Sequence, residues 1–156
     1  MEQTRGRLTG PTTSPRTAAV WAVLRRELDR RDGRTLTVLD VGGGTGGFAV
    51  PLAEAGHRIT VVDASPDALA ALTRRAAEAG VGDRVRAVQG DGDALADLVE
   101  PADADLVLCH SVLEVVDDPG RVVAALATVL RPGGAASVLV ASRAAAVLSR
   151  AVNGQL

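Results

Sequence analysis

Short apolar runs alternate with segments whose apolar residues recur at helical spacing along most of the chain. The apolar runs predict five strands, at 36–41, 58–62, 84–88, 105–109 and 136–141. The segments between them predict helices at about 46–55, 66–79, 93–99 and 119–130. Because strands that are apolar on both faces alternate with helices, we expect a doubly wound, Rossmann-like α/β fold, with helices on both faces of a parallel sheet of about five strands.

One further helix is predicted before the first strand. Ser14 and Pro15 are residue types that favour the N-cap and the first helical position. A stripe at helical spacing then extends to about residue 31 and consists of Thr17, Val20, Trp21, Leu24 and Leu28. We therefore expect a flexible lead-in at 1–13 and a single domain over 14–156.

Composition narrows the class of protein. The chain has 156 residues, of which 47% are apolar and 23% charged, as in one globular domain. Its apolar runs are shorter than the ~20 residues of a membrane-spanning helix, and its first residues lack the apolar segment of a secretory signal. We expect a cytoplasmic protein. Cys109 is the only cysteine, and His57 and His110 are the only histidines, so we expect no disulfide and no metal site.

Arginine supplies all 17 basic side chains, and the first 34 residues are locally basic. A basic segment can face an anionic partner, but these arginines also fit an ordinary solvated helix face. Trp21 and Phe48 are the only aromatic residues, so the chain lacks the base-stacking surface that single-strand nucleic-acid binders commonly use.

A glycine-rich turn follows the first predicted strand. Glycine permits a tight turn and lets a ligand approach the backbone closely. Gly42, Gly44 and Gly47 match the G-x-G-x-x-G pattern of dinucleotide-binding enzymes, which makes a nicotinamide-dependent oxidoreductase one candidate. Asp63, at the end of the second predicted strand, occupies the position of an acid that accepts hydrogen bonds from ribose hydroxyls in dinucleotide and nucleoside cofactors.

Asp40, two residues before the first glycine, distinguishes between the cofactors. Its carboxylate would repel a pyrophosphate, whereas it is compatible with the ammonium and sulfonium groups of S-adenosylmethionine. A purely structural turn between strand and helix is the remaining alternative.

Over roughly residues 14–156, the sequence resembles the class I S-adenosylmethionine-dependent methyltransferases. The D-x-G-x-G-x-G motif of that family matches residues 40–46, and four further motifs follow in order at 60–65, 89–92, 105–110 and 130–134. The resemblance implies S-adenosylmethionine as cofactor, with Asp63 on the ribose and Asp91 on the adenine. The implied cofactor-binding residues are Asp40, Gly42, Gly43, Gly44, Gly46, Asp63, Ala64, Asp91, Gly92 and His110.

A closer resemblance is to the tRNA 5-carboxymethoxyuridine methyltransferases. Thr12, Thr13 and Arg16 are similar to the N-terminal motif of that family, 110–115 to its His-Ala-Val-Leu-Glu-Trp segment and 152–155 to its Gly-Asn region. The resemblance implies that Arg16 pairs with the methionine carboxylate of the cofactor and that the acceptor is a carboxylate on a modified tRNA uridine. A small-molecule acceptor stays open, and we expect no catalytic base, because a carboxylate acceptor has no proton to lose.

Members of the resembling fold usually have seven strands, whereas only a helix at 143–151 is predicted after the fifth strand here. We therefore expect a fold that is incomplete at its C-terminal edge, with an open fifth strand that invites pairing. The chain would then be a fragment of a longer protein or a homodimer joined through that edge. A non-catalytic or truncated cofactor-binding module is the alternative to an active methyltransferase.

Overall fold

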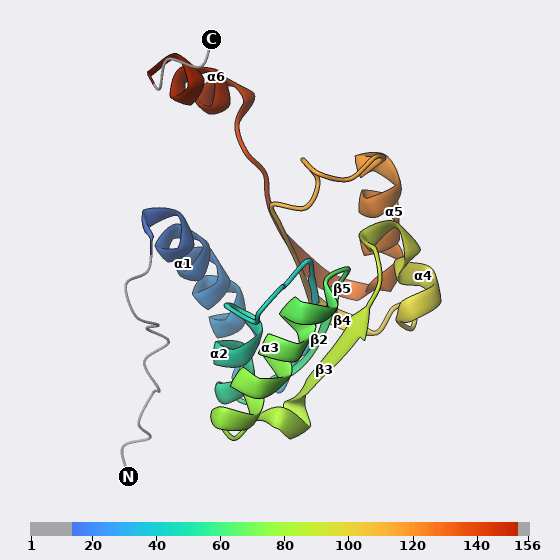
Figure 1. Ribbon diagram of the computed structural model, residues 1–156. Helices are drawn as coiled ribbons and strands as arrows, with labels where there is room; N and C mark the ends of the chain where they lie inside the picture. Colours follow the sequence, from blue (N-terminus) through green and yellow to red (C-terminus); the bar gives the residue numbers. More distant parts are fainter. Residues whose placement is uncertain (1–13, 153–156) are drawn as a thin grey trace.

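The computed structural model describes residues 14–152, apart from the side chains of 146–149 (Figure 1). The lead-in predicted at 1–13 lies outside the described residues. The helices are α1 (Pro15–Asp29), α2 (Ala49–Glu54), α3 (Pro66–Glu78), α4 (Leu95–Leu98), α5 (Pro119–Val129) and α6 (Arg143–Val152). The strands are β1 (Thr37–Val41), β2 (Arg58–Asp63), β3 (Val85–Gln89), β4 (Ala104–His110) and β5 (Leu130–Leu139), and single 3₁₀ turns, η1 (Gly82–Arg84) and η2 (Gly92–Ala94), precede β3 and α4.

The five strands form one parallel sheet in the order β3-β2-β1-β4-β5. β1 lies in the centre, between β2 and β4. The chain therefore runs outward from β1 to one edge and then returns to build the other side. The carboxyl ends of β1 and β4 flank the point at which the direction reverses, which is where open α/β sheets bind ligands.

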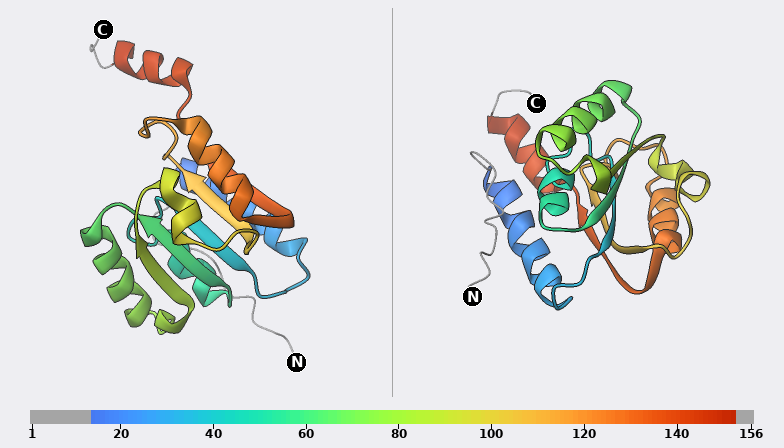
Figure 2. Two further views of the ribbon diagram at one scale, coloured as in Figure 1. Left: turned by 90° about the vertical axis from the view of Figure 1, so that its right-hand side faces the viewer. Right: turned by 90° about the horizontal axis from the view of Figure 1, so that it is seen from below.

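Two apolar cores cover the two faces of the sheet (Figure 2). Val38 packs into the core that α1, α2 and α3 form, and Trp21 contributes to the same core. Its neighbour Leu39 packs into the other core, with Leu126 of α5 and Leu95 of α4. Successive residues of a strand point to opposite faces, so β1 is buried on both sides and the predicted doubly wound α/β fold is confirmed.

Side-chain caps begin three of the helices. Ser14 accepts a hydrogen bond from the backbone N–H of Thr17 at 3.2 Å, which confirms the predicted start of α1. Ser65 and Asp118 begin α3 and α5 in the same way. In each case Pro follows the cap, because its fixed φ fits the first helical turn and its missing N–H would have no helical partner there.

Three predicted boundaries were wrong. The helix expected at 46–55 begins only at Ala49, because Gly44 and Gly46 have φ values of 56° and 85°, outside the helical range. The helix expected at 93–99 is the 3₁₀ turn η2 followed by the four residues of α4. The fifth strand begins at Leu130 rather than 136, but residues 131–134 interrupt its pairing with β4: Leu130 pairs with Ala104 and Ala135 with Leu106, and Gly133 between them has a φ of 79°.

β5 pairs with β4 and lies at the edge of the sheet. After β5 the chain leaves the sheet, and α6 extends away from the rest of the molecule (Figure 1). None of the helices in the described part of the chain is long and apolar enough to cross a membrane.

Candidate functional site

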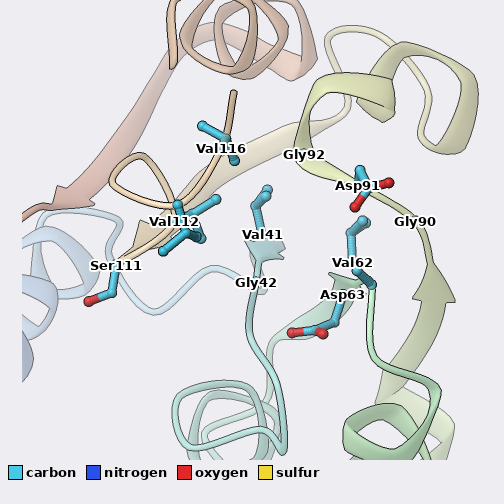
Figure 3. Close-up of a pocket in the computed structure, with 12 residues that line it drawn as sticks. Val41, Gly42, Val62, Asp63, Gly90, Asp91, Gly92, Ser111, Val112 and Val116 are labelled. Carbon is cyan, nitrogen blue, oxygen red and sulfur yellow. The ribbon is translucent and has the colours of Figure 1, made fainter. Parts of the chain in front are cut away.

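A cavity of about 320 Å³ opens at the carboxyl edge of the sheet (Figure 3). The ends of β1, β2 and β4 and the segment after β3 each contribute to its wall. Its polar lining comes from Asp63, Asp91 and Ser111, and its apolar lining includes Val41 and Val112. Among the described lining residues there is no Lys or Arg. The cavity thus presents two carboxylates and no cation to a ligand.

The glycine turn after β1 leaves no room for a side chain at Gly42. Gly42, which lines the cavity, has a φ of 70°, and a Cβ atom there would lie 2.5 Å from Cγ2 of Val112. Such a contact is well inside the normal separation of carbon atoms. Glycine at this position therefore allows the turn, the loop after β4 and a ligand to approach one another.

Asp63 ties the glycine turn to the start of α3. One carboxylate oxygen accepts from the backbone N–H of Gly44 and the other from that of Ser65, both at 2.9 Å. Each oxygen has a second lone pair, so the side chain can accept further hydrogen bonds from a ligand. Ala64, the next residue, also lines the cavity.

Asp40 lies beneath the glycine turn and does not line the cavity. A Cβ atom on Gly43 would lie 2.5 Å from its Oδ2, so the turn rests directly on this carboxyl group. Burial, and to a smaller extent the charge of Asp63, raises the pKa of Asp40 to about 7. A cation bound above the turn would favour the ionised form.

Asp91 lines the same cavity as Asp63, from the segment after β3 (Figure 3). It precedes η2, but its side chain makes no capping hydrogen bond there. An Asx turn, the alternative explanation for an Asp in this loop, is therefore absent. Asp91 and the neighbouring Gly92 both line the cavity, and the Asp91 carboxylate is exposed and available to a ligand.

Arg16 reaches the rim of the cavity from α1. Its guanidinium donates a hydrogen bond to the hydroxyl of Ser111, which lines the cavity. Ser111 has a φ of 60°, a conformation that residues with a Cβ rarely adopt. The sequence did not identify Ser111, because nothing in a Ser-Val pair after a strand indicates a left-handed backbone. A polar residue directly after a buried strand was the one available signal.

His110 does not line the cavity. Its Nε2 lies 2.9 Å from the hydroxyl of Ser137 on β5, and its ring packs edge-on against Phe48 at a centroid distance of 4.9 Å. Burial, followed by the charge of Arg16, lowers the pKa of His110. Its Nδ1 is buried and has no hydrogen-bond partner among the described residues. The ring is thus neutral at pH 7 and lies on the α1 side of the sheet.

The remaining titratable candidates have structural explanations. Asp118 caps α5, since its carboxylate accepts from the backbone N–H of Arg121 at 3.1 Å. Cys109 is buried, and burial raises the pKa of its thiol, so it is not an activated nucleophile. In the described part of the chain, no group of three or more His, Cys, Asp or Glu side chains is arranged to hold a metal ion.

A doubly wound sheet with a glycine turn and two carboxylates in one cavity is typical of folds that bind a nucleoside-containing ligand at the carboxyl ends of their strands. The family model described as "Methyltransferase domain" matches residues 39–138, and the chain therefore belongs to the S-adenosylmethionine-dependent methyltransferase family. This match covers the glycine turn and all five strands up to Val138, and it assigns the turn to this family rather than to nicotinamide-dependent enzymes.

Three relatives illustrate the range of the family. The tRNA 5-carboxymethoxyuridine methyltransferase of Escherichia coli (strain K12) is 37% identical over 80% of this chain and 47% of its own length. The ubiquinone biosynthesis O-methyltransferase of Xylella fastidiosa (strain 9a5c) is 36% identical over 75% of this chain and 46% of its own. The solved arsenic(III) S-adenosylmethionine methyltransferase of Chlamydomonas reinhardtii is 28% identical, with a TM-score of 0.58 over 66% of this chain and 38% of that one. The chain spans about half the length of the curated relatives it matches.

Proposed function

We propose that this chain binds S-adenosylmethionine in the cavity at the carboxyl edge of the sheet and presents its methyl group to an acceptor. The observation that carries the proposal is the charge of the cavity wall, which Asp63 and Asp91 line and no described Lys or Arg lines, whereas Arg16 lies at the rim. This wall suits a ligand with a sulfonium and an ammonium group and disfavours the pyrophosphate of a dinucleotide.

The described residues fit the parts of this cofactor. Asp63 retains lone pairs for the ribose hydroxyls, and the Asp91 carboxylate is available to the adenine amino group. The Arg16 guanidinium, held at the rim by Ser111, suits the methionine carboxylate. Gly42 permits close approach along the turn, and buried Asp40 supplies negative charge beneath it.

The proposed reaction needs positioning rather than acid–base chemistry. The cofactor, when bound, supplies a methyl group already activated for in-line displacement by its sulfonium. The chain holds and orients the two reactants and excludes water, which can supply much of the rate. We assign no catalytic base. Glu114 and Asp117, near the cavity, are exposed and lie on the loop before α5.

For the acceptor, we propose a carboxylate on a modified tRNA uridine, supported by the 37% identity to the Escherichia coli enzyme. A small-molecule hydroxyl is the second candidate, and the Xylella fastidiosa O-methyltransferase supports it. Incubation with methyl-labelled S-adenosylmethionine and either tRNA carrying the unmethylated uridine carboxylate or a small phenol separates the two. Transfer to neither, in a chain that binds the cofactor, would establish a cofactor-binding module without transfer.

Calorimetric titration with S-adenosylhomocysteine tests the cofactor site directly. The Asp63→Asn variant should lose ~1–3 kcal/mol of binding free energy, as expected for a lost partner of buried hydroxyls. Asp67→Asn is the matched control, because it removes the same charge from an exposed residue in the first turn of α3, outside the cavity. Equal binding by wild type and Asp63→Asn, or tighter binding of NAD, would refute the proposed site.

We also make a proposal for the partner of the chain and one for its location in the cell. We propose pairing of β5 with β5 of a second copy in a homodimer, supported by the edge position of β5 and by Val138, which is 48% exposed there. Sedimentation of wild type and of Val138→Lys tests it, since a charge on the edge should shift a dimer to monomer. A monomeric wild type would refute it. We also propose a cytoplasmic location, which cell fractionation checks.

A further inference from the structure

A second cavity, of about 420 Å³, lies at the opposite edge of the sheet, and the proposed methyl transfer does not use it. It is located where β2 and β3 begin, and it is lined by Thr35, Gly56, Arg58, Asp83 and Arg84. Four of these five residues carry a polar side chain, and three of them a charge. The lining of this cavity is therefore polar, unlike that of a gap in the apolar core.

The two arginines come from neighbouring elements. Arg58 is the first residue of β2, and Arg84 is the last residue of η1, directly before β3. Ile59 pairs with Val85, so both arginines lie at the amino ends of neighbouring strands, and both line this cavity. Like charges in one cavity favour binding of an anion.

Neither guanidinium has an acidic partner within the described residues. No carboxylate lies within 4.0 Å of Arg58 or Arg84, and the one hydrogen bond of the Arg84 side chain, to the carbonyl of Ala53, is long at 3.5 Å. Elsewhere on the same edge of the sheet, Arg34 and Arg131 both pair with Asp105. Arg58 and Arg84 therefore line the cavity without a carboxylate partner among the described residues.

We propose that this cavity binds the phosphate group of a phosphorylated ribose. Arg58 and Arg84 would hold the phosphate oxygens, since a planar guanidinium donates two parallel hydrogen bonds to such a group. The hydroxyl of Thr35 can donate a further bond. Asp83 would repel a bare phosphate, but it accepts hydrogen bonds from sugar hydroxyls, which is why the ligand is a sugar phosphate and not an inorganic ion.

The site is independent of the methyl-transfer proposal, because it lies at the amino ends of strands whose carboxyl ends form the cofactor cavity. The same chemistry is found in a free ribonucleotide and in an RNA chain. Ribose 5-phosphate and a short oligouridylate RNA are the two probes that distinguish these sources. Because both arginines are exposed, binding of either probe should weaken as the salt concentration rises.

Calorimetric titration of the full chain at fixed ionic strength tests the site. Arg58→Gln and Arg84→Gln should each weaken binding of ribose 5-phosphate at least ~10-fold, as for the loss of a charge-assisted hydrogen bond. Arg86→Gln is the matched control: Arg86 is exposed on β3, two residues from Arg84 and outside the cavity, and the same charge is removed. Saturating S-adenosylhomocysteine should leave the affinity unchanged.

Three results would overturn the proposal: no saturable binding of either probe, an equal loss in Arg86→Gln, or competition by S-adenosylhomocysteine. Tight binding of the RNA with loss in Arg58→Gln assigns the site to RNA, and binding of ribose 5-phosphate alone assigns it to a free nucleotide. If Arg84→Gln fails to fold by thermal melting, Thr35→Val and Arg58→Lys test the same cavity. The first should weaken binding, and the second should retain part of it.

Discussion

At the residue scale, the charge of Asp40 determines how the proposed cofactor site responds to pH. The pKa of this buried carboxyl is about 7, so below pH 7 the ligand-free chain holds a proton there. A cationic cofactor above the turn favours the ionised form, and binding below pH 7 must therefore release that proton. Affinity for S-adenosylmethionine should fall by up to about tenfold per pH unit below pH 7 and level off above it.

Calorimetry across pH 5.5 to 8.5, at roughly half-unit steps, measures this slope. The Asp40→Asn variant has no titrating group at this position, so its affinity should be lower and nearly flat with pH. S-adenosylhomocysteine lacks the sulfonium charge and should show a shallower slope with the wild-type chain. A flat profile for wild type with S-adenosylmethionine would contradict the role of Asp40.

Ser111 is the second residue with an expected measurable consequence. Its φ of 60° strains a residue that has a Cβ, by roughly 1–2 kcal/mol relative to glycine. Ser111→Gly should therefore raise the free energy of unfolding in urea by ~1 kcal/mol relative to Ser111→Ala, while both weaken cofactor binding, because Arg16 loses its partner. Asp32→Gly, at a φ of 51° and outside the cavity, should stabilise the chain without affecting binding. Equal stability of the two Ser111 variants would refute the strain.

At the element scale, one buried carboxylate joins three strands at the amino edge of the sheet. Asp105 of β4 accepts from the backbone N–H of Thr37 on β1 at 2.9 Å and pairs with Arg131 of β5 at 3.0 Å. Asp105 is 2% exposed, so its removal leaves the Thr37 N–H without a partner. We expect Asp105→Ala to cost ~2–3 kcal/mol of unfolding free energy in urea denaturation.

Asp103→Ala is the control for this change. Asp103 also pairs with Arg131, at 3.8 Å, but its side chain is 61% exposed. Exposed ion pairs contribute little, so the loss should stay below ~0.5 kcal/mol. Equal losses in the two variants would show that the net charge, rather than the buried connection between strands, stabilises this edge.

The five strands show what the sequence could and could not predict. The first four apolar runs and the capping residues were sufficient to place β1 to β4 and the start of α1, because short apolar runs and cap chemistry are local signals. The start of β5 was wrong because it depends on the pairing of Leu130 with Ala104, a residue 26 positions earlier in the chain, which a local pattern does not report. Residues 131–134 follow as an irregularity in the pairing.

The residues of the candidate site also fall into those whose place the sequence predicted and those whose place it did not. The resemblance to class I methyltransferases implied that Asp63, Asp91 and the glycine turn surround one cofactor, and all three line one cavity. The positions of Asp40 beneath the turn and of His110 against Ser137 depend on side-chain packing between distant strands, which periodicity does not report.

At the scale of the whole molecule, buried titratable groups make folding stability depend on pH in two opposed ways. The Nδ1 of His57 accepts from the backbone N–H of Leu36 at 3.2 Å, and burial lowers the pKa of this ring, as it does that of His110. The unfolded chain therefore binds these protons first, and stability should fall as the pH drops below the unfolded value of about 6.5. Asp40 acts in the opposite direction: its folded pKa is raised, so the stability it contributes is present below the unfolded value and is lost as the pH rises through 7.

Urea denaturation across pH 5 to 9, at roughly unit steps, should show these two dependences opposing each other below about pH 7 and a level stability above it. Each dependence has its own variant. Asp40→Asn should remove the loss that accompanies a rise in pH up to about 7, so stability should climb more steeply with pH than in wild type. His57→Gln, whose amide oxygen can accept from the backbone N–H of Leu36, should reduce the loss of stability as the pH falls below about 6.5. Asp40 lies near the end of β1, whereas His57 bonds Leu36 just before its start, and the two side chains share no partner. The changes in unfolding free energy should therefore add in the double variant. A strongly non-additive result would mean that the two ends of the sheet unfold as separate units.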